Sequence, residues 1–351
     1  MVIFLILSFL TVIVRFENPN YFCHYTFYSL TVTANTKNMK AIVLEETGGA
    51  ENLTIKDIEN PVAKENEVLI AVKAISVNPV DYKVRANDEV LQKICGGQAP
   101  IILGWDVAGK VVAIGNGISQ YKVGDEVFGM LNFPGRGNAY AEIVAAPEDH
   151  IAKMPKNLSF EDAAATTLAA LTALQVLQGK VQKDDKVLIH AGSGGVGHFA
   201  IQIAKWLGAY VITTSSAKNR DFVLALGADE HIDYRAQAFE NVVRDIDFVF
   251  DMFNGDILLN SVKVVKKGGS IVSIPTPEFS DEIMNLAKER NVHVSNLLVQ
   301  SNGNDMNTLK GLLESGAIKP QVSKTFPFDR MAEAHQQLES GRTVGKVVVT
   351  L

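Results

Sequence analysis

The chain has 351 residues, 47% of them hydrophobic and 21% charged, so it is long enough for two globular domains. Its formal net charge of −6 is spread along the chain without a basic block, which argues against nucleic acid or an anionic membrane surface as a partner. Cys23 and Cys95 are its only cysteines, which excludes a disulfide framework and a cysteine-rich zinc site and predicts a reducing, cytoplasmic location.

The first residues do not fit this picture. Residues 1–14 are nearly all apolar, with Ser8 and Thr11 as the exceptions. As a helix they would span about 21 Å, less than the bilayer core of about 30 Å. No basic residue precedes the run, and no clear cleavage site follows it. Because Met39 opens a clean strand pattern, a start assigned too far upstream is favoured, with a membrane anchor or signal peptide, or an ordered extension over 1–38, as the alternatives.

Residues 39–160 are predicted to form a β-rich domain. Short runs of β-formers alternate with glycine turns, which favours a compact, barrel-like arrangement. The expected strands are Met39–Leu44, Glu67–Val77, Val107–Ile114 and Asp125–Phe128, with turns at Gly115–Gly117 and Lys122–Asp125.

The pattern changes near Ser159, a helix N-cap candidate before an Ala-rich helical run. Strands and helices then alternate, with Gly208 and Gly227 where helices should end, which predicts a parallel, doubly wound sheet over 161–303. Its expected strands are Lys186–His190, Tyr210–Thr214, Ile246–Asp251, Ser270–Ile274 and Val292–Val299. Residues 304–351 are expected to add two helices and two strands (Gln321–Phe326 and Lys346–Leu351) and to return to the first domain, closing a cleft between the two.

A glycine turn follows the first of these strands. After the apolar run Val187–Ile189, the spacing of Gly192, Gly194 and Gly197 fits G-x-G-x-x-G, and a helical pattern continues from Phe199. Strand, glycine turn and helix in this order predict a dinucleotide site, in which backbone N–H groups and the helix N-terminus face a pyrophosphate. The alternative is a tight turn without a ligand. The cofactor-binding residues expected here are Gly192, Ser193, Gly194, Gly195, Val196 and Gly197.

The residues after the second strand indicate which dinucleotide binds. An acidic residue about 20 positions past the glycines would bind the ribose 2′-OH of NAD. Residues 211–220 contain no carboxylate and instead offer the hydroxyls of Ser215 and Ser216 and the cations of Lys218 and Arg220. Hydroxyls and cations suit a 2′-phosphate, so NADPH is predicted rather than NADH. Alternatively, the two cations are solvated residues of a helix's first turn, where they would oppose the helix dipole.

A set of short motifs runs through residues 39–351. They are Val77-Asn-Pro-Val-Asp81, Gly104-Trp-Asp-Val-Ala-Gly109, Val123-Gly-Asp-Glu-Val-Phe-Gly129, Tyr140-Ala-Glu-Ile-Val144, Ala164–Ala173, Ala191–Gly197, Leu226-Gly-Ala-Asp229, Lys267-Gly-Gly269 and Gly345-Lys-Val-Val348. With them the chain resembles the zinc-independent quinone oxidoreductases, the zeta-crystallin-like branch of the medium-chain dehydrogenases/reductases. The resemblance implies an α/β protein with a GroES-like β-rich catalytic domain (39–160), a Rossmann doubly wound parallel-sheet domain (161–303), and NADPH in the cleft.

The resemblance also implies a homodimer that pairs the edge strands of two Rossmann sheets, here residues 293–298. Further cofactor contacts carried over from it are Thr167, Tyr234, Phe253, Ile274, Leu298 and Lys346. The loop with Asn132 and Phe133 is expected to line the acceptor pocket, although Phe133 can equally belong to the core.

Zinc-dependent relatives place a Cys after the long strand and a Gly-His-Glu where this chain has Gly104-Trp105-Asp106. Neither Cys nor His stands at these points, so no catalytic metal is expected. His190 and His198, which flank the glycine turn, are expected to be packing or surface residues rather than ligands or bases.

Without a metal, a hydride goes most readily to an acceptor that is already electrophilic, such as a quinone or the C=C bond of an α,β-unsaturated carbonyl. Tyr82 or Lys83 is expected to donate to the developing oxyanion, while Asn78 and Asp81 orient the site. Two other functions fit the same fold: a 2-enoyl-thioester reductase and a non-enzymatic NADPH-binding or sensor protein.

Overall fold

A computed structural model describes residues 38–156, 158–275 and 278–351. The predictions made for the first residues, an anchor, a leader or an extension, lie outside the described residues. Within the described part of the chain, no helix is both long and apolar enough to cross a membrane.

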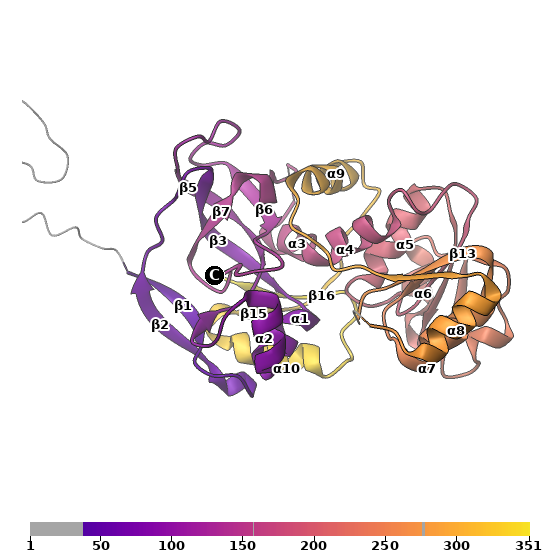
Figure 1. Cartoon of the computed structure of the whole chain (residues 1–351). Coiled ribbons are helices and arrows are strands. Elements are labelled where there is room, and N and C mark those ends of the chain that lie inside the picture. Colours follow the sequence, from indigo (N-terminus) through magenta and orange to yellow (C-terminus); the bar gives the residue numbers. More distant parts are fainter. Residues whose placement is uncertain (1–37, 157, 276–277) are drawn as a thin grey trace, which may run out of the picture. The chain divides into compact units, whose positions relative to one another are not determined.

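The N-terminal half of this part is built on a seven-stranded sheet with the order β15-β16-β3-β5-β6-β8, in which β7 also pairs with β3 (Figure 1). A three-stranded sheet, β2-β1-β4, lies beside it. The strands are β1 (Asn38–Leu44), β2 (Leu53–Glu59), β3 (Glu67–Val77), β4 (Ile101–Ile102), β5 (Asp106–Ile114), β6 (Glu126–Met130), β7 (Ile143–Pro147), β8 (Ile151–Lys153), β15 (Val322–Pro327) and β16 (Lys346–Thr350).

Strand β3 is the centre of this sheet. Its first residues alternate between buried and half-buried positions and its last four are all buried, as expected for a strand that enters the core at its C-terminal end. It pairs antiparallel with β5, β7 and β16. The end of the chain therefore lies in the same sheet as the segment that leads to the predicted catalytic turn.

The second half is a six-stranded sheet with the order β11-β10-β9-β12-β13-β14, and all its pairings are parallel. Its strands are β9 (Lys186–Ile189), β10 (Tyr210–Ser215), β11 (Glu230–Asp233), β12 (Ile246–Asp251), β13 (Val265–Ser273) and β14 (His293–Asn296). The predicted α/β class, with a GroES-like β-rich part and a parallel Rossmann-type sheet, is confirmed.

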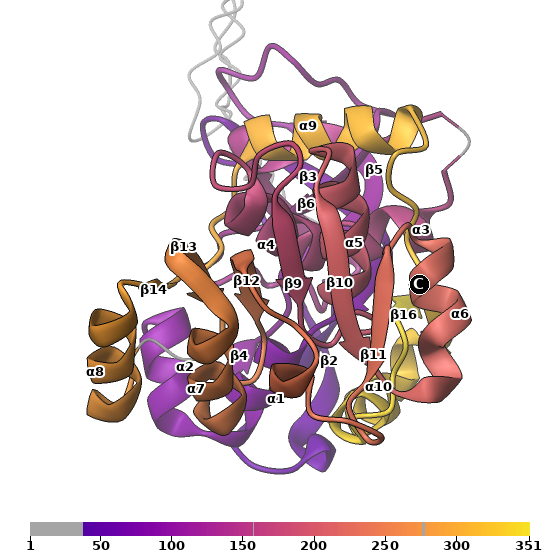
Figure 2. The same cartoon turned by 90° about the vertical axis from the view of Figure 1, so that its right-hand side faces the viewer.

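Helices cover both faces of this parallel sheet (Figure 2). They are α4 (Leu168–Leu177), α5 (Gly197–Trp206), α6 (Arg220–Ala225), α7 (Gly255–Val264) and α8 (Asp281–Arg290). Because side chains alternate along a strand, Val187 and Ile189 of β9 join the core that contains α4 and α5, while Leu188 joins the core that contains α7 and α8. Each face therefore has its own apolar core, and the ends of the strands stay free for a ligand.

The Ala-rich helix predicted from Ser159 is divided in two. Helix α3 (Phe160–Ala165) begins after Ser159, whose hydroxyl accepts from the Asp162 N–H at 3.0 Å, and α4 starts only at Leu168. At the break, the hydroxyls of Thr166 and Thr167 donate to backbone carbonyls within α3, each at 2.8 Å. Such side-chain bonds compete with helix continuation. The break leaves the first N–H groups of α4 in need of a partner.

Candidate cofactor and catalytic site

The glycine turn between β9 and α5 is packed too closely for side chains at two positions. A Cβ on Gly192 would lie 2.0 Å from Thr213 Oγ1, and one on Gly197 would lie 2.2 Å from the Ala191 carbonyl oxygen. At Gly194 the nearest atom, again the Ala191 oxygen, is 3.2 Å away. Gly192 thus lets the turn pack against β10, and Gly197 lets α5 begin close to the turn. Gly194 is among the residues that line the cavity described next.

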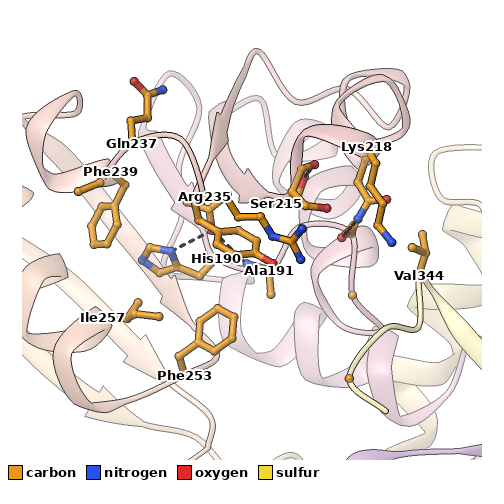
Figure 3. Close-up of a pocket in the computed structure, with 18 of the residues that line it drawn as sticks. His190, Ala191, Ser215, Lys218, Arg235, Gln237, Phe239, Phe253, Ile257 and Val344 are labelled. Atoms are coloured by element: carbon orange, nitrogen blue, oxygen red, sulfur yellow. Dashed lines mark hydrogen bonds between the residues drawn. The ribbon is translucent and has the colours of Figure 1, made fainter. Parts of the chain in front are cut away.

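A cavity of about 570 Å³ opens at this turn (Figure 3). This volume is in the range of small-molecule and cofactor sites. Its lining comes from four regions: the glycine turn, the ends of β10 and β11, the start of α7, and residues 341–344. The residues are His190, Ala191, Ser193, Gly194, Thr214, Ser215, Ser216, Lys218, Asn219, Tyr234, Arg235, Gln237, Ala238, Phe239, Glu240, Phe253, Asp256, Ile257, Asn260, Gly341, Arg342, Thr343 and Val344.

One end of the cavity carries hydroxyls and cations. Figure 3 shows Ser215, Lys218 and Arg235 at this end. Neither Lys218 nor Arg235 forms an ion pair with a residue of the described chain, although the Arg235 guanidinium lies 5.7 Å from the Tyr234 ring centroid. The two lining carboxylates, Glu240 and Asp256, come from other segments and not from the end of β10. This donor set fits a phosphate monoester.

The other end contains the ring of His190 and the apolar side chains of Phe239, Phe253 and Ile257 (Figure 3). His190 is 1% exposed, lies edge-on to Phe239 at 4.7 Å, and forms hydrogen bonds with Thr214 and Ser261. Burial lowers the pKa of His190 to about 3, so the ring is neutral. Flat apolar walls of this kind suit an aromatic base.

Two hydrogen bonds hold the walls of the cavity to the glycine turn. Asn219 Nδ2 donates to Ser193 Oγ at 2.9 Å, and the Gly345 N–H donates to the Ser193 carbonyl, also at 2.9 Å. The cation-bearing segment and the C-terminal segment are therefore fixed to the same residue of the turn.

Some of the predicted cofactor residues line the cavity, and others lie outside it. Ser193, Gly194, Ser215, Ser216, Lys218, Tyr234 and Phe253 line the cavity. Arg220 does not: it is the first residue of α6, its side chain is 62% exposed, and it pairs with its neighbour Asp221. Ile274, which packs against the core, and Leu298, which is 53% exposed, are also outside the lining.

Arg235, Arg342 and Asn219 line the cavity but were not predicted from the sequence. Arg235 directly follows Tyr234, which the resemblance gives as a cofactor contact, and Asn219 directly follows Lys218. Adjacency was the only available signal for these two residues. Arg342 reaches the cavity through the fold of the C-terminal segment.

The predicted catalytic turn begins helix α1 (Pro79–Ala86). Asn78 caps it, the Asp81 carboxylate accepts from the Asn78 N–H at 2.6 Å, and both residues are at most 1% exposed. Burial raises the pKa of Asp81 to about 7. With side chains this buried, the two residues can shape the turn but have little surface to offer a substrate.

Tyr82 and Lys83 differ in exposure. Tyr82 is half-buried, and its burial together with the Glu339 carboxylate raises its pKa. Lys83 is exposed and makes no hydrogen bond or ion pair within the described residues. Of the two, Lys83 has the freer side chain.

Lys346 points away from the cavity. It is 3% exposed, and its ammonium group donates to Asn78 Oδ1 and lies 3.9 Å from Asp106 Oδ2. Thr167, the N-cap of α4, is likewise buried beside this group. The charge of Lys346 is bound to Asn78 and Asp106 inside the protein, and its role as a cofactor contact stays a prediction.

The loop around Asn132 and Phe133 is tied into the protein. Phe133 is 4% exposed and packs edge-on against Trp105 at 5.2 Å, so it belongs to the core. The Asn132 N–H donates to His150 Nδ1, and the Phe133 N–H donates to Ser301 Oγ. Asn132, which is half-buried, is the member of this pair that still reaches the surface.

The described residues offer no group of three or more His, Cys, Asp or Glu side chains that could hold a metal ion. His198 accepts from Gln321 and bonds to the Gly194 carbonyl, and burial lowers its pKa to about 4. Asn78 and Trp105 occupy the positions where zinc-dependent relatives carry ligands. The residues present do not fit a catalytic zinc.

Comparisons with known proteins agree with this architecture. Residues 64–156 match the alcohol dehydrogenase GroES-like domain family, and residues 226–349 match a family described as zinc-binding dehydrogenase. The 2-methylene-furan-3-one reductase of Solanum lycopersicum is 36% identical over 327 residues, which cover 89% of this chain and 79% of that protein. The chloroplastic NADPH-dependent alkenal/one oxidoreductase of Arabidopsis thaliana is 34% identical, with 92% and 82% covered.

Among solved structures, the quinone oxidoreductase from Coxiella burnetii has a TM-score of 0.84 and 38% identity, covering 90% of this chain and all of that one (100%). The chain belongs to the quinone oxidoreductase branch of the medium-chain dehydrogenase/reductase superfamily. It is therefore an oxidoreductase of the medium-chain type, and its relatives use a nicotinamide cofactor. The zinc named in the family description has no ligand set in the described residues.

Proposed function

We propose that the protein is an NADPH-dependent reductase that works without a catalytic metal and reduces a quinone or the C=C bond of an α,β-unsaturated carbonyl. The observation that carries this proposal is the cation-and-hydroxyl end of the cavity, beside a glycine turn and without a carboxylate at the end of β10. The printed names of the relatives, an NADPH-dependent alkenal/one oxidoreductase and a quinone oxidoreductase, support the same reaction class.

NADPH preference rests on Lys218 and Arg235. Both cations line the cavity without a carboxylate partner, so a 2′-phosphate would gain two charge-assisted contacts. A ribose 2′-OH would leave them without a counter-charge. Ser215 and Ser216 supply hydroxyls at the same end, and the apolar end around His190 and Phe239 suits the adenine ring.

Metal independence rests on the residues that stand in place of zinc ligands. When bound, NADPH supplies a hydride. Without a Lewis acid to polarise a simple carbonyl, the acceptor must be electrophilic on its own, which quinones and enones are. The chain's own contribution is then to hold the two reactants in register and to stabilise the oxygen that gains negative charge.

The residues of α1 serve this purpose in two ways. Asn78 and Asp81 position the turn through the capping box. Lys83 or its neighbour Tyr82 donates to the developing oxyanion, and both have side chains that are not enclosed by the core. This division of labour assigns positioning to the buried pair and proton donation to the accessible pair.

Stopped-flow oxidation of NADPH with a panel of acceptors tests the proposed function. Turnover of a quinone or a short enone is the expected result. Turnover of enoyl-CoA alone would instead identify a 2-enoyl-thioester reductase, and tight NADPH binding without any acceptor would identify a binding or sensor protein.

We also propose that two copies pair through β14. This strand is the edge of the parallel sheet, and strand edges are ready sites for pairing with another chain. Light scattering is expected to give twice the chain's mass for the wild type and for Ser295→Ala. Ser295→Asp, which would bring like charges together across a two-fold axis, is expected to give monomers. A monomeric wild type would contradict the proposal.

A further inference from the structure

Asp106 connects the predicted catalytic turn to the cofactor half of the molecule. It is the first residue of β5 and is 0% exposed. Its Oδ2 accepts from Asn78 Nδ2 at 2.7 Å, and its Oδ1 accepts from the Leu168 N–H at 2.9 Å. One carboxylate thus holds both the start of α1 and the start of α4.

Lys346 is the third member of this buried group. Its ammonium donates to Asn78 Oδ1 and to the Val77 carbonyl, and it is the cation nearest to Asp106. Its stem runs under the glycine turn, where a Cβ on Gly195 would lie 3.4 Å from Lys346 Cδ. The buried group Asn78–Asp106–Lys346 is therefore hydrogen-bonded to the catalytic turn and to the first turn of α4, and it lies beside the glycine turn.

A buried carboxylate is a more costly cap for α4 than a neutral side chain would be. Buried charges are costly and must be paired and hydrogen-bonded. Burial indeed raises the pKa of Asp106 and lowers that of Lys346, while each opposes the shift of the other. A neutral residue could cap α4 at lower cost. A carboxylate, in contrast, offers acceptors on two sides and can fix two donors from separate segments in one orientation.

We propose that Asp106, supported by Lys346, is a positioning residue that fixes the catalytic turn relative to the first turn of α4 and the glycine turn, and so relative to the bound cofactor. This inference rests on the proposed function, since it concerns the register between the two reactants. It assigns no contact with substrate or cofactor to Asp106 itself.

Asp106→Asn tests the inference because an amide keeps the shape but has only one acceptor oxygen. It can serve Asn78 Nδ2 or the Leu168 N–H, and its NH2 group then faces the other donor. The expected result is a hydride-transfer rate lower by about 10- to 100-fold, with an acceptor KM changed by less than about twofold. Asp125→Asn is the matched control: it also removes a lysine-paired carboxylate of the β-rich domain, and it should keep the wild-type rate.

Binding gives a readout that does not depend on turnover. Adenosine 2′,5′-bisphosphate occupies only the adenosine end of a dinucleotide site, so its Kd is expected to stay unchanged in Asp106→Asn, while the Kd of NADPH rises. An equal loss of affinity for both ligands would indicate a general structural defect and overturn the inference. If the wild type reduces no acceptor, the proposed function fails. The ratio of the Kd values of NADPH and adenosine 2′,5′-bisphosphate still tests whether Asp106 positions the site.

The double variant Asp106→Asn with Lys346→Gln separates positioning from charge balance. It removes both charges, so it is expected to fold even if the single variant does not. Its hydride transfer is expected to stay as slow as predicted for Asp106→Asn. Recovery of the wild-type rate would show that Asp106 only neutralises Lys346, and a wild-type rate in Asp106→Asn itself would likewise overturn the inference.

Discussion

At the scale of single residues, the NADPH preference depends most on Lys218 and Arg235, two of the three cations that line the cavity. Lys218→Ala is expected to raise KM for NADPH by about 10-fold or more, since a charge-assisted hydrogen bond contributes about 1.5–3 kcal/mol. Use of NADH should hardly change. Arg220→Ala, only two residues away but outside the cavity, is the control and should leave both coenzymes unaffected. Equal losses for NADPH and NADH in Lys218→Ala would contradict the assignment.

The proton donor is also decided at this scale. Of the variants Lys83→Ala and Tyr82→Phe, the one that removes the proton donor is expected to lower kcat by about 10²-fold or more. The other variant should keep kcat near the wild-type value. Steady-state rates with a short enone at saturating NADPH make the comparison. If both variants keep full kcat, neither side chain donates.

At the scale of elements, the glycine turn separates packing from binding. Gly197→Ala places a methyl group 2.2 Å from the Ala191 carbonyl oxygen and so pushes α5 off β9. A loss of about 1–3 kcal/mol in the free energy of unfolding is expected in urea titrations. Gly194→Ala meets its nearest atom at 3.2 Å, so it should lose less stability but weaken NADPH binding, because Gly194 lines the cavity. The opposite ranking would mean that Gly194 does not face the cofactor.

Elements with local signals could be predicted from the sequence. β3 and β12 have the predicted bounds, Glu67–Val77 and Ile246–Asp251, because dense runs of β-formers define them. The break between α3 and α4 could not be predicted, since the group that receives the Leu168 N–H is Asp106, which lies far away in the chain. The partners of Lys346 inside the protein, Asn78 and Asp106, are also distant in the sequence, so the sequence alone could not predict them.

Some residues of the candidate site could likewise be predicted from the sequence, and others could not. The glycine turn follows β9, and Ser215 and Lys218 lie at the end of β10, so their place near the strand ends can be read from the sequence. The cavity position of Arg235, and the turning away of Arg220, depend on how β11 and α6 lie in space. Strand order and helix orientation fix these, and a linear pattern does not contain them.

At the scale of the whole molecule, buried histidines link stability to pH. The pKa of His190 is lowered to about 3 in the folded protein, while the unfolded chain titrates near 6.5. Between these values the unfolded state binds more protons, so this contribution to stability is present above pH 6.5 and is lost as the pH falls.

His190→Gln removes that linkage. Below pH 6.5, the free energy of unfolding of the wild type is expected to fall relative to that of His190→Gln by about 1.4 kcal/mol for each pH unit. A constant difference between His190→Gln and the wild type from pH 7 to pH 4 would mean that His190 is not held neutral by burial.

The central claim is that the protein transfers a hydride from NADPH to an electrophilic carbon without a metal. NADPH that carries deuterium at the transferred position of the nicotinamide, reacted with a short-chain enone after exhaustive chelation, tests it most directly by NMR of the product. The expected product is a saturated carbonyl compound with deuterium on the carbon β to the carbonyl group. Deuterium on the carbonyl carbon of an allylic alcohol, or a reaction that stops on chelation, would contradict it.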